Sequence, residues 1–436
     1  MGSLKIGVCG LGTVGSGVVN IFNAHHGLIQ QRCNADLQLV HIGARRDNPN
    51  CDTSSYRVSR DVFDVVRDPD VDVVVELMGG TTVARDLVTQ AIEAGKHVVT
   101  ANKALIAEYG NELVALAERA QVALRFEAAV AGGIPIIKVL RESLAANVVS
   151  GVAGIINGTG NFILTEMANA GRSFDDVLAE AQALGYAEAD PTFDIDGTDA
   201  AHKLVILASL AFGIPLDADA AVTEGIDKVT PEDLEFANEL GFCVKHLGIA
   251  RRNGNAIDLR VHPTLIPTHR QIARVDGVLN AVMVEADAVG EIVLTGPGAG
   301  SLPTASSVCG DLTDLGRVLT HSKVDPTPTL GVPCDQLKRL PLVPRDAVKG
   351  VWYLRMVVED RPGVMAEITG VLSERGISIE SLIQRPPAAG SSHVTVVILT
   401  DAVVCGQLDS AIIDMESLPA LMGSVVRLRV ESFKEA

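Results

Sequence analysis

The residue types best suited to chemistry lie in one acidic stretch, which reads GYAEADPTFDIDGTDAAHK from Gly185 to Lys203. Turn-forming dipeptides are followed by an apolar run, which predicts a helix that begins near Gly197 or Thr198. In that helix Asp199 and Lys203 are four residues apart on one face, so the carboxylate can hold the ammonium in place. An ordinary surface ion pair is the alternative, but the helix that follows is too apolar for a solvated surface. We therefore interpret Lys203, held by Asp199, as a candidate proton donor.

This stretch is similar to the signature segment of homoserine dehydrogenases, and the resemblance extends over nearly the whole chain. It implies that NAD(P)H reduces L-aspartate 4-semialdehyde to L-homoserine. We expect Lys203 to protonate the aldehyde oxygen, with Lys103 as the alternative donor. A charge-assisted hydrogen bond to Glu188, with Asp194 assisting, would hold the substrate ammonium. The matching positions are Ala183, Gly185, Glu188, Asp190, Pro191, Asp194, Gly197, Asp199 and Lys203.

Residues 1–146 alternate short β-branched runs with helical ones, a pattern typical of a parallel, doubly wound α/β sheet. The first turn has the spacing G-x-G-x-x-G between a strand and a helix, which brings backbone N–H groups to a pyrophosphate. We predict a Rossmann-type dinucleotide site there, although a tight turn without a ligand can have the same spacing. The turn residues are Gly10, Leu11, Gly12, Thr13, Val14 and Gly15.

The second predicted strand is followed by Arg45 and Arg46 rather than by the acid that reads an NAD ribose. Guanidinium groups suit a 2′-phosphate, so NADP is the favoured cofactor and NAD the alternative. Lys103 ends the sequence T-A-N-K after a later strand, at the edge where such sheets bind ligands. In the family that the chain resembles, this lysine lies close to cofactor and substrate. Gly185 and Gly310 are further expected cofactor contacts, and Gly185 is also an expected substrate contact.

Glu127 precedes a glycine-rich backbone in RFEAAVAGGIPII, which could present several oxygens to a hard cation. A simple strand-to-helix junction is the alternative. The family resemblance implies a monovalent cation, sodium in particular, held by Glu127 and the backbones of Val130, Gly132 and Ile134. We expect a structural role for it, since a monovalent ion polarises a carbonyl group weakly.

A second domain, residues 147–322, contains the acidic stretch and several neighbouring strands with one apolar face. These features predict an α+β unit whose mixed sheet bears the catalytic site and a dimer interface. Asn157 lies in a polar loop that opens a helix, where it could bind substrate. Residues 303–322 resemble the segment with which the family returns to its nucleotide-binding domain.

Residues 323–349 contain five prolines, which indicates a stiff inter-domain connection. Residues 350–436 then show the order β-α-β-β-α-β of a ferredoxin-like fold. This unit resembles an ACT domain, a small-molecule sensor, and threonine is its expected effector because the implied product lies on the route to threonine. A role in assembly alone is the alternative, and we expect a homodimer or homotetramer. The residues that suggest an effector site are Asp360, Pro362, Gly363, Val364, Gly376 and Ile377.

The composition argues against several classes of partner. A formal net charge of −18 disfavours nucleic acid and anionic membranes. The chain has no apolar run of membrane-spanning length and does not open with an export signal, so we expect a cytoplasmic protein. Its seven cysteines are scattered without a C-x-x-C pair, which predicts neither a disulfide framework nor a zinc site.

Two other classes of function are alternatives to a reductase. Another dehydrogenase of aspartate-derived amino acids or semialdehydes is one alternative, and a phosphorylating semialdehyde dehydrogenase would need a thiolate nucleophile beside the nicotinamide. The chain has no cysteine between Cys51 and Cys243. A nonenzymatic amino-acid-sensing regulator could combine the two folds, but the sequence lacks an effector module such as a basic helix-turn-helix.

Overall fold

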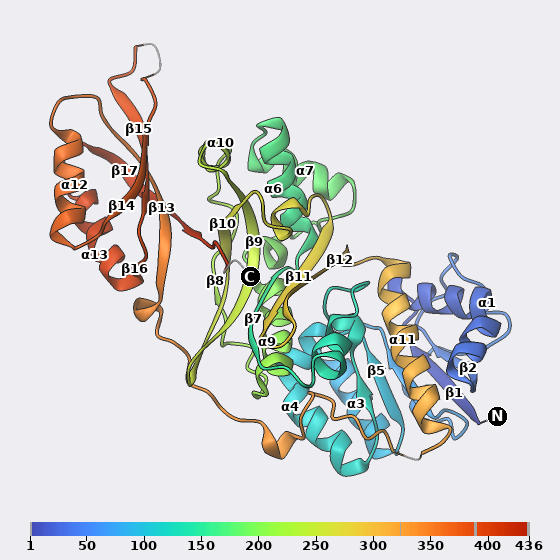
Figure 1. Ribbon diagram of the computed structural model, residues 1–436. Helices are drawn as coiled ribbons and strands as arrows, with labels where there is room; N and C mark the ends of the chain where they lie inside the picture. Colours follow the sequence, from blue (N-terminus) through green and yellow to red (C-terminus); the bar gives the residue numbers. More distant parts are fainter. Residues whose placement is uncertain (1, 323, 388–389, 434–436) are drawn as a thin grey trace.

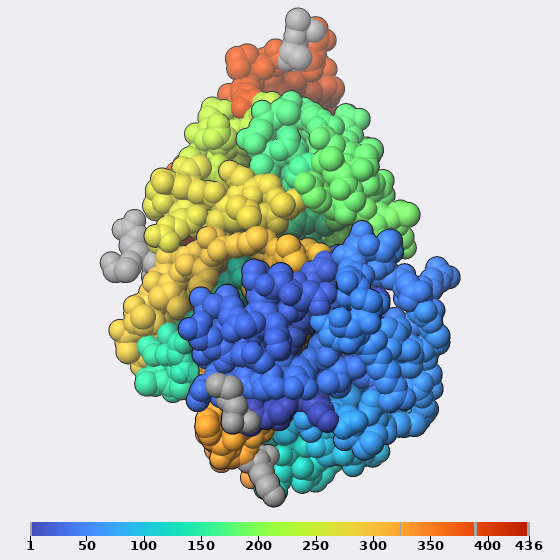
Figure 2. All heavy atoms as spheres, turned by 90° about the vertical axis from the view of Figure 1, so that its right-hand side faces the viewer, coloured from blue at the N-terminus to red at the C-terminus, as the bar shows by residue number. Residues whose placement is uncertain are grey.

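The computed structural model describes residues 2–322, 324–387 and 390–433. Its three parts follow one another along an elongated molecule. Figure 1 shows the N-terminal part at one end, the C-terminal part at the other and a long sheet between them. In Figure 2 the N-terminal part, coloured blue, lies below the green and yellow second part.

The N-terminal part is built on six strands that are all parallel, in the order β3-β2-β1-β4-β5-β6. This is the strand order of a doubly wound dinucleotide-binding sheet, so the predicted Rossmann-type fold is confirmed. The sequence pattern does not predict β3, because its three residues are too few to show a period. The strands are β1 (Ser3–Cys9), β2 (Asp36–Gly43), β3 (Arg57–Ser59), β4 (Val73–Glu76), β5 (His97–Thr100) and β6 (Leu124–Arg125).

Helices cover both faces of this sheet and bury its β-branched side chains. The long helix α11 comes from a later part of the chain and packs beside α1. Ala305, Val308 and Leu312 of α11 join the same buried cluster as Val18 and Val19 of α1. The helices of this part are α1 (Thr13–Cys33), α2 (Phe63–Arg67), α3 (Thr82–Glu93), α4 (Lys103–Ala120) and α11 (Ser301–Leu319).

The second part is a sheet in the order β12-β11-β7-β9-β10 with antiparallel neighbours, and the short β8 adds a parallel pair to β10. The predicted mixed sheet is therefore confirmed. The strands are β7 (Val149–Ile155), β8 (Val222–Thr223), β9 (Phe242–Asn253), β10 (Ala256–Pro267), β11 (Leu279–Ala286) and β12 (Gly290–Pro297). The helices are α6 (Gly158–Ala170), α7 (Phe174–Ala183), α8 (Thr192–Ile195), α9 (Thr198–Phe212) and α10 (Pro231–Glu239).

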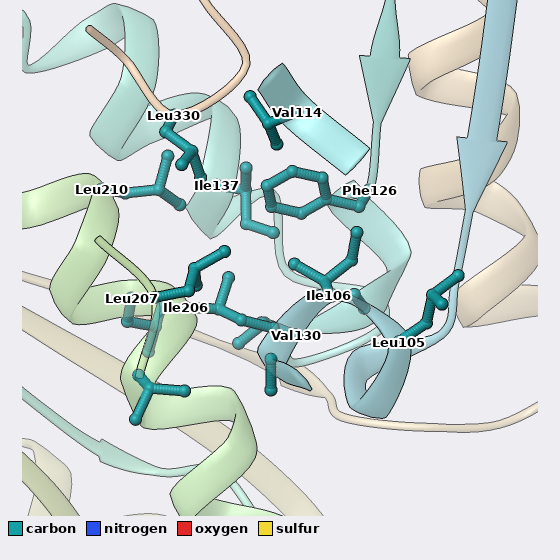
Figure 3. Close-up of a cluster of buried hydrophobic side chains, with 14 of the residues drawn as sticks. Leu105, Ile106, Val114, Phe126, Val130, Ile137, Ile206, Leu207, Leu210 and Leu330 are labelled. Carbon is teal, nitrogen blue, oxygen red and sulfur yellow. The ribbon is translucent and has the colours of Figure 1, made fainter. Parts of the chain in front are cut away.

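Helix α9 joins the first two parts because its side chains are apolar on nearly every side. Figure 3 shows Ile206, Leu207 and Leu210 of α9 in one buried cluster with Leu105 and Ile106 of α4. Complete burial of such a side chain stabilises the fold by about 1.5–3 kcal/mol. This packing therefore fixes the polar start of α9 relative to the start of α4.

The C-terminal part has the strand order β17-β13-β15-β14, which confirms the predicted ferredoxin-like fold. Its sheet is not separate, however. The end of β17 pairs in parallel with β10, so within the described residues the two sheets form one path of strands. The elements are β13 (Lys349–Glu359), α12 (Val364–Glu374), β14 (Ile379–Gln384), β15 (His393–Thr400), β16 (Val403–Val404), α13 (Cys405–Glu416) and β17 (Leu421–Val430).

The proline-rich stretch is not a free connection but a strap packed on both earlier parts. Leu330 is fully buried in the main core, and Asp325 forms an ion pair with the buried Arg125. Further along, the N–H of Val343 donates to the carbonyl of Ile257 at 2.8 Å. Proline has no backbone N–H, so fewer groups of this extended segment need a hydrogen-bond partner when it packs on the protein surface. Among the described residues, no helix is long and apolar enough to cross a membrane.

Candidate active site

The first turn of the Rossmann-type sheet is shaped by a close backbone contact. Gly10 has φ +105°, and a Cβ on it would lie 2.6 Å from the carbonyl oxygen of Leu77. Glycine is therefore required where the chain leaves β1 and passes the loop after β4. Gly12, in contrast, has open space on its Cβ side and begins α1 without a side-chain cap. The N–H groups at this positive helix end suit a pyrophosphate.

A cavity of about 690 Å³ opens beside this turn, between the loops that follow β1, β2 and β4. These loops meet where the strand order reverses, the place at which doubly wound sheets bind ligands. Thr13, Val14 and Gly15 form the first turn of α1, directly after the lining residues. The lining includes Gly10, Leu11, Gly12, Ala44, Arg45, Arg46, Arg60, Met78 and Gly79.

The structure places three arginines on this cavity, one more than the sequence indicates. Arg45 and Arg46 are exposed, and neither has an ion-pair partner within the described residues. Arg60 also lines the cavity, but it is held by Asp47 through contacts of 2.8 and 3.0 Å. The unpaired guanidinium groups are thus Arg45 and Arg46, which are available to a phosphate. The sequence motif does not identify Arg60, because this residue follows β3, a strand that the sequence pattern does not predict.

The structure does not bring Gly310 to the cofactor cavity. Gly310 lies in the middle of α11, on its exposed side, and does not line the cavity. The start of the helix is the part close to the nucleotide turn, because the Ser301 hydroxyl donates to the carbonyl of Thr13 at 2.7 Å. Gly310 therefore stays a predicted cofactor contact that lies outside the lining of this cavity.

Three helices begin at the polar cluster that contains the candidate proton donor. Lys103 is the first residue of α4 and follows β5, at the same sheet edge as the nucleotide turn. Asn157 caps α6, where its Oδ1 accepts from the N–H of Gly160 at 2.7 Å. Asp199 lies in the first turn of α9. The positive ends of three helix dipoles therefore favour negative charge at this point.

Asp199 is the centre of this cluster and binds both lysines. Its Oδ2 lies 2.6 Å from the Nζ of Lys203, and its Oδ1 lies 3.0 Å from the Nζ of Lys103. The side chain is 5% exposed. Burial alone would raise the pKa of Asp199, but the ammonium groups, Lys203 foremost, outweigh it and hold that pKa at about 2. Asp199 therefore stays ionised at neutral pH and fixes both cations.

Lys203 is the more enclosed of the two lysines, with 13% of its side chain exposed against 34% for Lys103. Besides Asp199 it donates to the carbonyl of Ile156 at 2.7 Å. An ammonium group carries three N–H donors, so one remains for a further acceptor. The predicted helix start and the Asp199–Lys203 contact are both present, and the geometry suits a positioned proton donor.

Asn157 positions the carboxylates rather than presenting a free amide to a ligand. Its Nδ2 donates to Asp199 and to Asp194, each at 2.8 Å, and the residue is 5% exposed. Burial raises the pKa of Asp194, whereas the hydrogen bond from Asn157 opposes this shift. Asn157 was expected to contact substrate, but its donors are already used within the cluster. Asp194, which is only partly buried, remains accessible to a substrate ammonium.

Glu188 and Gly185 precede α8, in the same acidic stretch as Asp194 and Asp199. Both are exposed in the loop between α7 and α8, and Gly185 has the positive φ of +75° that ends α7. No hydrogen bond joins the Glu188 carboxylate to another described residue, which leaves it free for a ligand. The structure thus does not place these two residues in contact with the lysines.

His246 is a buried support of the site that sequence reasoning missed. Its Nε2 lies 3.0 Å from the carbonyl of Glu224, and its ring lies beneath Gly197, which begins α9. Burial lowers the pKa of His246 to about 4, so the ring is neutral at physiological pH. A histidine in the middle of an apolar strand gives no signal of this role, because the contact depends on how β9 packs under α9.

The segment proposed for a cation contains the buried carboxylate of Glu127, in η1 (Glu127–Ala129). The Glu127 carboxylate accepts from the N–H groups of Ile137 and Lys138 at 2.9 and 2.8 Å. Burial raises its pKa to about 7, and the nearby Asp311 adds to this effect. A bound cation would offset that cost. Within the described residues no group of three or more acids, histidines or cysteines is placed to hold a metal.

The residues with the ACT-like pattern occupy two separate turns of the C-terminal part. Asp360 and Pro362 lie in the turn after β13, and Gly363, with φ +98°, begins α12 ahead of Val364. Gly376, with φ +66°, and Ile377 follow the other end of α12. A helix of 11 residues is about 16 Å long. One small ligand can therefore contact both turns only if two copies of this part meet.

The nucleotide turn, residues 10–15, and the lysine cluster, which is Asp199 with Lys103 and Lys203, meet at one edge of the first sheet. Asn102, which caps α4, donates to the carbonyl of Gly80 at 2.7 Å, so the loop beside the cofactor cavity is tied to the start of α4. A cofactor in the cavity and a carbonyl compound on the lysines would thus be neighbours. The fold and this site define an NAD(P)-dependent oxidoreductase with an appended ACT domain.

Comparison with known proteins specifies the family. Residues 135–313 match the homoserine dehydrogenase family, residues 10–127 its NAD-binding domain and residues 352–414 the ACT domain. The homoserine dehydrogenase of Pseudomonas aeruginosa is 53% identical over 99% of both chains, and that of Neisseria gonorrhoeae is 46% identical over 100% of both. The chain belongs to the homoserine dehydrogenase family.

Solved structures agree with this assignment. The crystal structure of a homoserine dehydrogenase from Thiobacillus denitrificans is 49% identical, with a TM-score of 0.93 over 99% of this chain and 98% of that chain. A hyperthermophilic archaeal homoserine dehydrogenase in complex with NADPH is 28% identical, with a TM-score of 0.60 over 71% of this chain and 96% of that chain.

Proposed function

We propose that this enzyme reduces L-aspartate 4-semialdehyde to L-homoserine with NAD(P)H, in the route to threonine, methionine and isoleucine. The observation that carries the proposal is the carboxylate of Asp199, which holds Lys203 and Lys103 together beside the nucleotide cavity. Bound NAD(P)H supplies the hydride. The chain supplies a proton donor, a positive field and groups that recognise an amino acid.

Lys203 is the residue that we assign to protonation of the aldehyde oxygen. Two of its N–H groups are fixed on Ile156 and Asp199, so the third is held in a defined position. Negative charge that develops on the oxygen is stabilised by this ammonium, by Lys103 and by the three helix N-termini. Lys103 is more exposed and is the alternative donor.

The partly buried Asp194 and the exposed Glu188 are the acids that we assign to the substrate ammonium. Asp194 is fixed by Asn157, whereas Glu188 lies on the loop that would cover the ligand. A carboxylate and an ammonium form a charge-assisted hydrogen bond, which selects an amino acid over a simple aldehyde.

The cysteines argue against an acylating dehydrogenase. Cys9, at the end of β1, is the cysteine nearest in sequence to the nucleotide turn, and burial raises the pKa of its thiol far above the ordinary value. Burial also raises the pKa of the Cys309 thiol, to about 12. A nucleophile of that reaction must be a thiolate at neutral pH, so neither residue suits it.

An absorbance assay tests the proposed function. Purified enzyme mixed with L-homoserine and NADP should produce reduced nicotinamide, and omission of L-homoserine should abolish the signal. If phosphate were required, or if no cofactor were reduced, the assignment would be wrong.

The unpaired arginines predict a preference for NADP. Replacement of Arg45 and Arg46 by alanine removes hydrogen bonds to a 2′-phosphate, which NADH lacks. We expect the KM for NADPH to rise roughly 10-fold or more and the KM for NADH to change less than about 2-fold. Steady-state kinetics with both cofactors measures this, with the exposed Arg119→Ala on α4 as the control. Equal effects on the two cofactors would mean that the arginines do not read the phosphate.

We propose a sodium ion at Glu127, with the backbones of Val130, Gly132 and Ile134 as further ligands. Its charge would offset the buried carboxylate and so stabilise the strand-to-helix junction. When sodium replaces choline at constant ionic strength, the melting temperature of the wild type should rise by roughly 2 °C or more. The exposed control Glu93→Gln should show the same rise. Glu127→Gln should lose this response. An unchanged response in Glu127→Gln would refute the site.

We propose that threonine inhibits the enzyme through the C-terminal part, in a homodimer or homotetramer. The two turns at opposite ends of α12 support an effector site shared by two copies, with the turn at Asp360 from one and that at Gly376 from the other. A coupling of roughly 1–3 kcal/mol would give several-fold to hundredfold inhibition.

The exposed Asp360 allows this regulation to be tested in the full chain. Asp360→Ala should raise the threonine concentration for half-inhibition roughly 10-fold or more while activity without threonine is kept. The control is Asp401→Ala, another exposed acid of the same part. Inhibition curves that coincide for wild type and Asp360→Ala would contradict the proposal, and a wild type insensitive to threonine would point to another effector.

A further inference from the structure

The seam between the C-terminal sheet and the second sheet contains a buried arginine that has no ion-pair partner among the described residues. Arg429 of β17 is 4% exposed, and its strand neighbours are Thr264 of β10 and Trp352 of β13. The guanidinium carbon lies 4.3 Å from the centroid of the Trp352 ring. Within the described residues its Nε and Nη1 have no hydrogen-bond partner, and no carboxylate lies at ion-pair distance.

Arg260 of β10 brings a second buried charge to the same place. It is 5% exposed, and its Nη2 lies 2.5 Å from the carboxylate of Asp258. Its Nε has no partner in the part of the chain that the structure describes. Glu431 lies 3.9 Å from Arg260 but is bound by Arg251 at 2.7 Å. The carboxylates of Asp258 and Glu431 are therefore already paired, and within the described residues Arg429 has no carboxylate at ion-pair distance.

Both arginines line a cavity of about 50 Å³. One water molecule takes up about 30 Å³ of liquid, so the cavity has room for one or two species of that size. Asp258 lies in its wall, Arg345 lines it from the strap, and most other lining side chains are apolar. Buried charges are costly unless they are paired, and a water molecule brings no charge to pair with. We infer that this cavity binds one small monovalent anion, of the size of chloride, between Arg429 and Arg260.

The proposed anion site lies where the C-terminal sheet joins the second sheet. The seam has two residue pairs, Thr264 with Arg429 and Leu265 with Val430. An anion that neutralises Arg429 at this seam would stabilise the attachment of the C-terminal part to the sheet that supports the active site. The inference does not depend on the proposed reaction, because none of these residues belongs to the nucleotide turn or to the lysine cluster.

Trp352 provides a direct readout, because it is the single tryptophan of the chain and is 1% exposed. Bromide quenches indole fluorescence, and a fully buried ring is poorly reached by random collisions. We expect saturable quenching of Trp352 when bromide replaces gluconate at constant sodium and ionic strength, and chloride should compete. Arg429→Met should raise the apparent Kd for bromide roughly 10-fold or more.

The matched control is Arg427→Met, on the same strand. Arg427 also lies near Trp352, at 5.7 Å from the ring centroid, but it is paired with Asp409 and is less buried. This variant should keep the wild-type response. Should Arg429→Met fail to fold, Arg260→Gln is expected to weaken bromide binding in the same way. Linear quenching that is equal in the wild type, the control and the folded cavity variant would overturn the inference.

Discussion

Replacement of Lys203 by alanine is expected to lower kcat by roughly 100-fold or more, with cofactor binding unchanged. The residue is held by Asp199 at 2.6 Å and by the carbonyl of Ile156 at 2.7 Å, so its position is defined before substrate arrives. The Lys203 ammonium stabilises the negative charge that develops on the aldehyde oxygen in the transition state. Because this interaction is weaker in the bound ground state, its loss should lower kcat and leave KM largely unchanged. Steady-state kinetics in both directions, with cofactor affinity from nicotinamide fluorescence, measures this.

Lys228→Ala serves as the control, since Lys228 is an exposed lysine of the same part of the chain. It should retain wild-type kinetics. If Lys203→Ala kept kcat within about threefold of wild type while Lys103→Ala lost it, the proton donor would be Lys103 instead. Equal retention in both variants would refute the lysine cluster as the catalytic site.

The change Asp199→Asn should affect both activity and acid stability. Asparagine cannot neutralise the ammonium groups of Lys203 and Lys103, so we expect kcat to fall by roughly 100-fold. The pKa of Asp199 is about 2 in the folded chain and ~3.9 in an unfolded one, which corresponds to roughly 2–3 kcal/mol of stability. Because the folded-state pKa is the lower one, this stability is present above pH ~4 and is lost as pH falls through about 2.

Chemical denaturation at pH 7 and near pH 3 measures that contribution. Asp199→Asn should be less stable than wild type at pH 7, and the difference should shrink at the lower pH. The control Asp190→Asn changes an exposed acid of the same stretch, whose carboxylate accepts from Thr192. A difference between Asp199→Asn and wild type that is independent of pH would show that the Asp199 charge does not stabilise the fold.

The sequence was sufficient to predict those parts of the site that depend on local spacing. Asp199 and Lys203 are one helical turn apart, and the glycines of the first turn occupy fixed offsets between a strand and a helix. Such relations need no knowledge of tertiary structure. The alternation of elements likewise determined the doubly wound sheet, because β-branched runs and helical runs differ in period.

The parts that the sequence did not reveal depend on how distant elements pack. Asn157 lies in a loop suited to ligand binding, yet its amide binds Asp194 and Asp199, which are brought to it by α8 and α9. His246 supports the start of α9 from a strand whose own pattern is simply apolar. The start of α11 lies beside the nucleotide turn, and this contact depends on how α11 packs on α1.

The join between the second sheet and the C-terminal sheet is the largest architectural feature that was not predicted. β17 extends beyond the ferredoxin-like unit and pairs with β10 at its last residues. Strand periodicity shows which face of a strand is buried but not which edge a neighbour will cover. The buried charge of Arg429 could not be inferred either, since an arginine in an alternating strand normally faces solvent.

Isotope transfer into the product tests the central claim most directly. The enzyme is given L-aspartate 4-semialdehyde and NADPH that carries deuterium at C4 of the nicotinamide, with each of the two C4 stereoisomers in turn, and the product is analysed by mass spectrometry. The account predicts L-homoserine with one deuterium on C4 from one stereoisomer and none from the other, and loss of this product in Lys203→Ala. L-homoserine without deuterium from either stereoisomer, or no reduction of the semialdehyde, would contradict it.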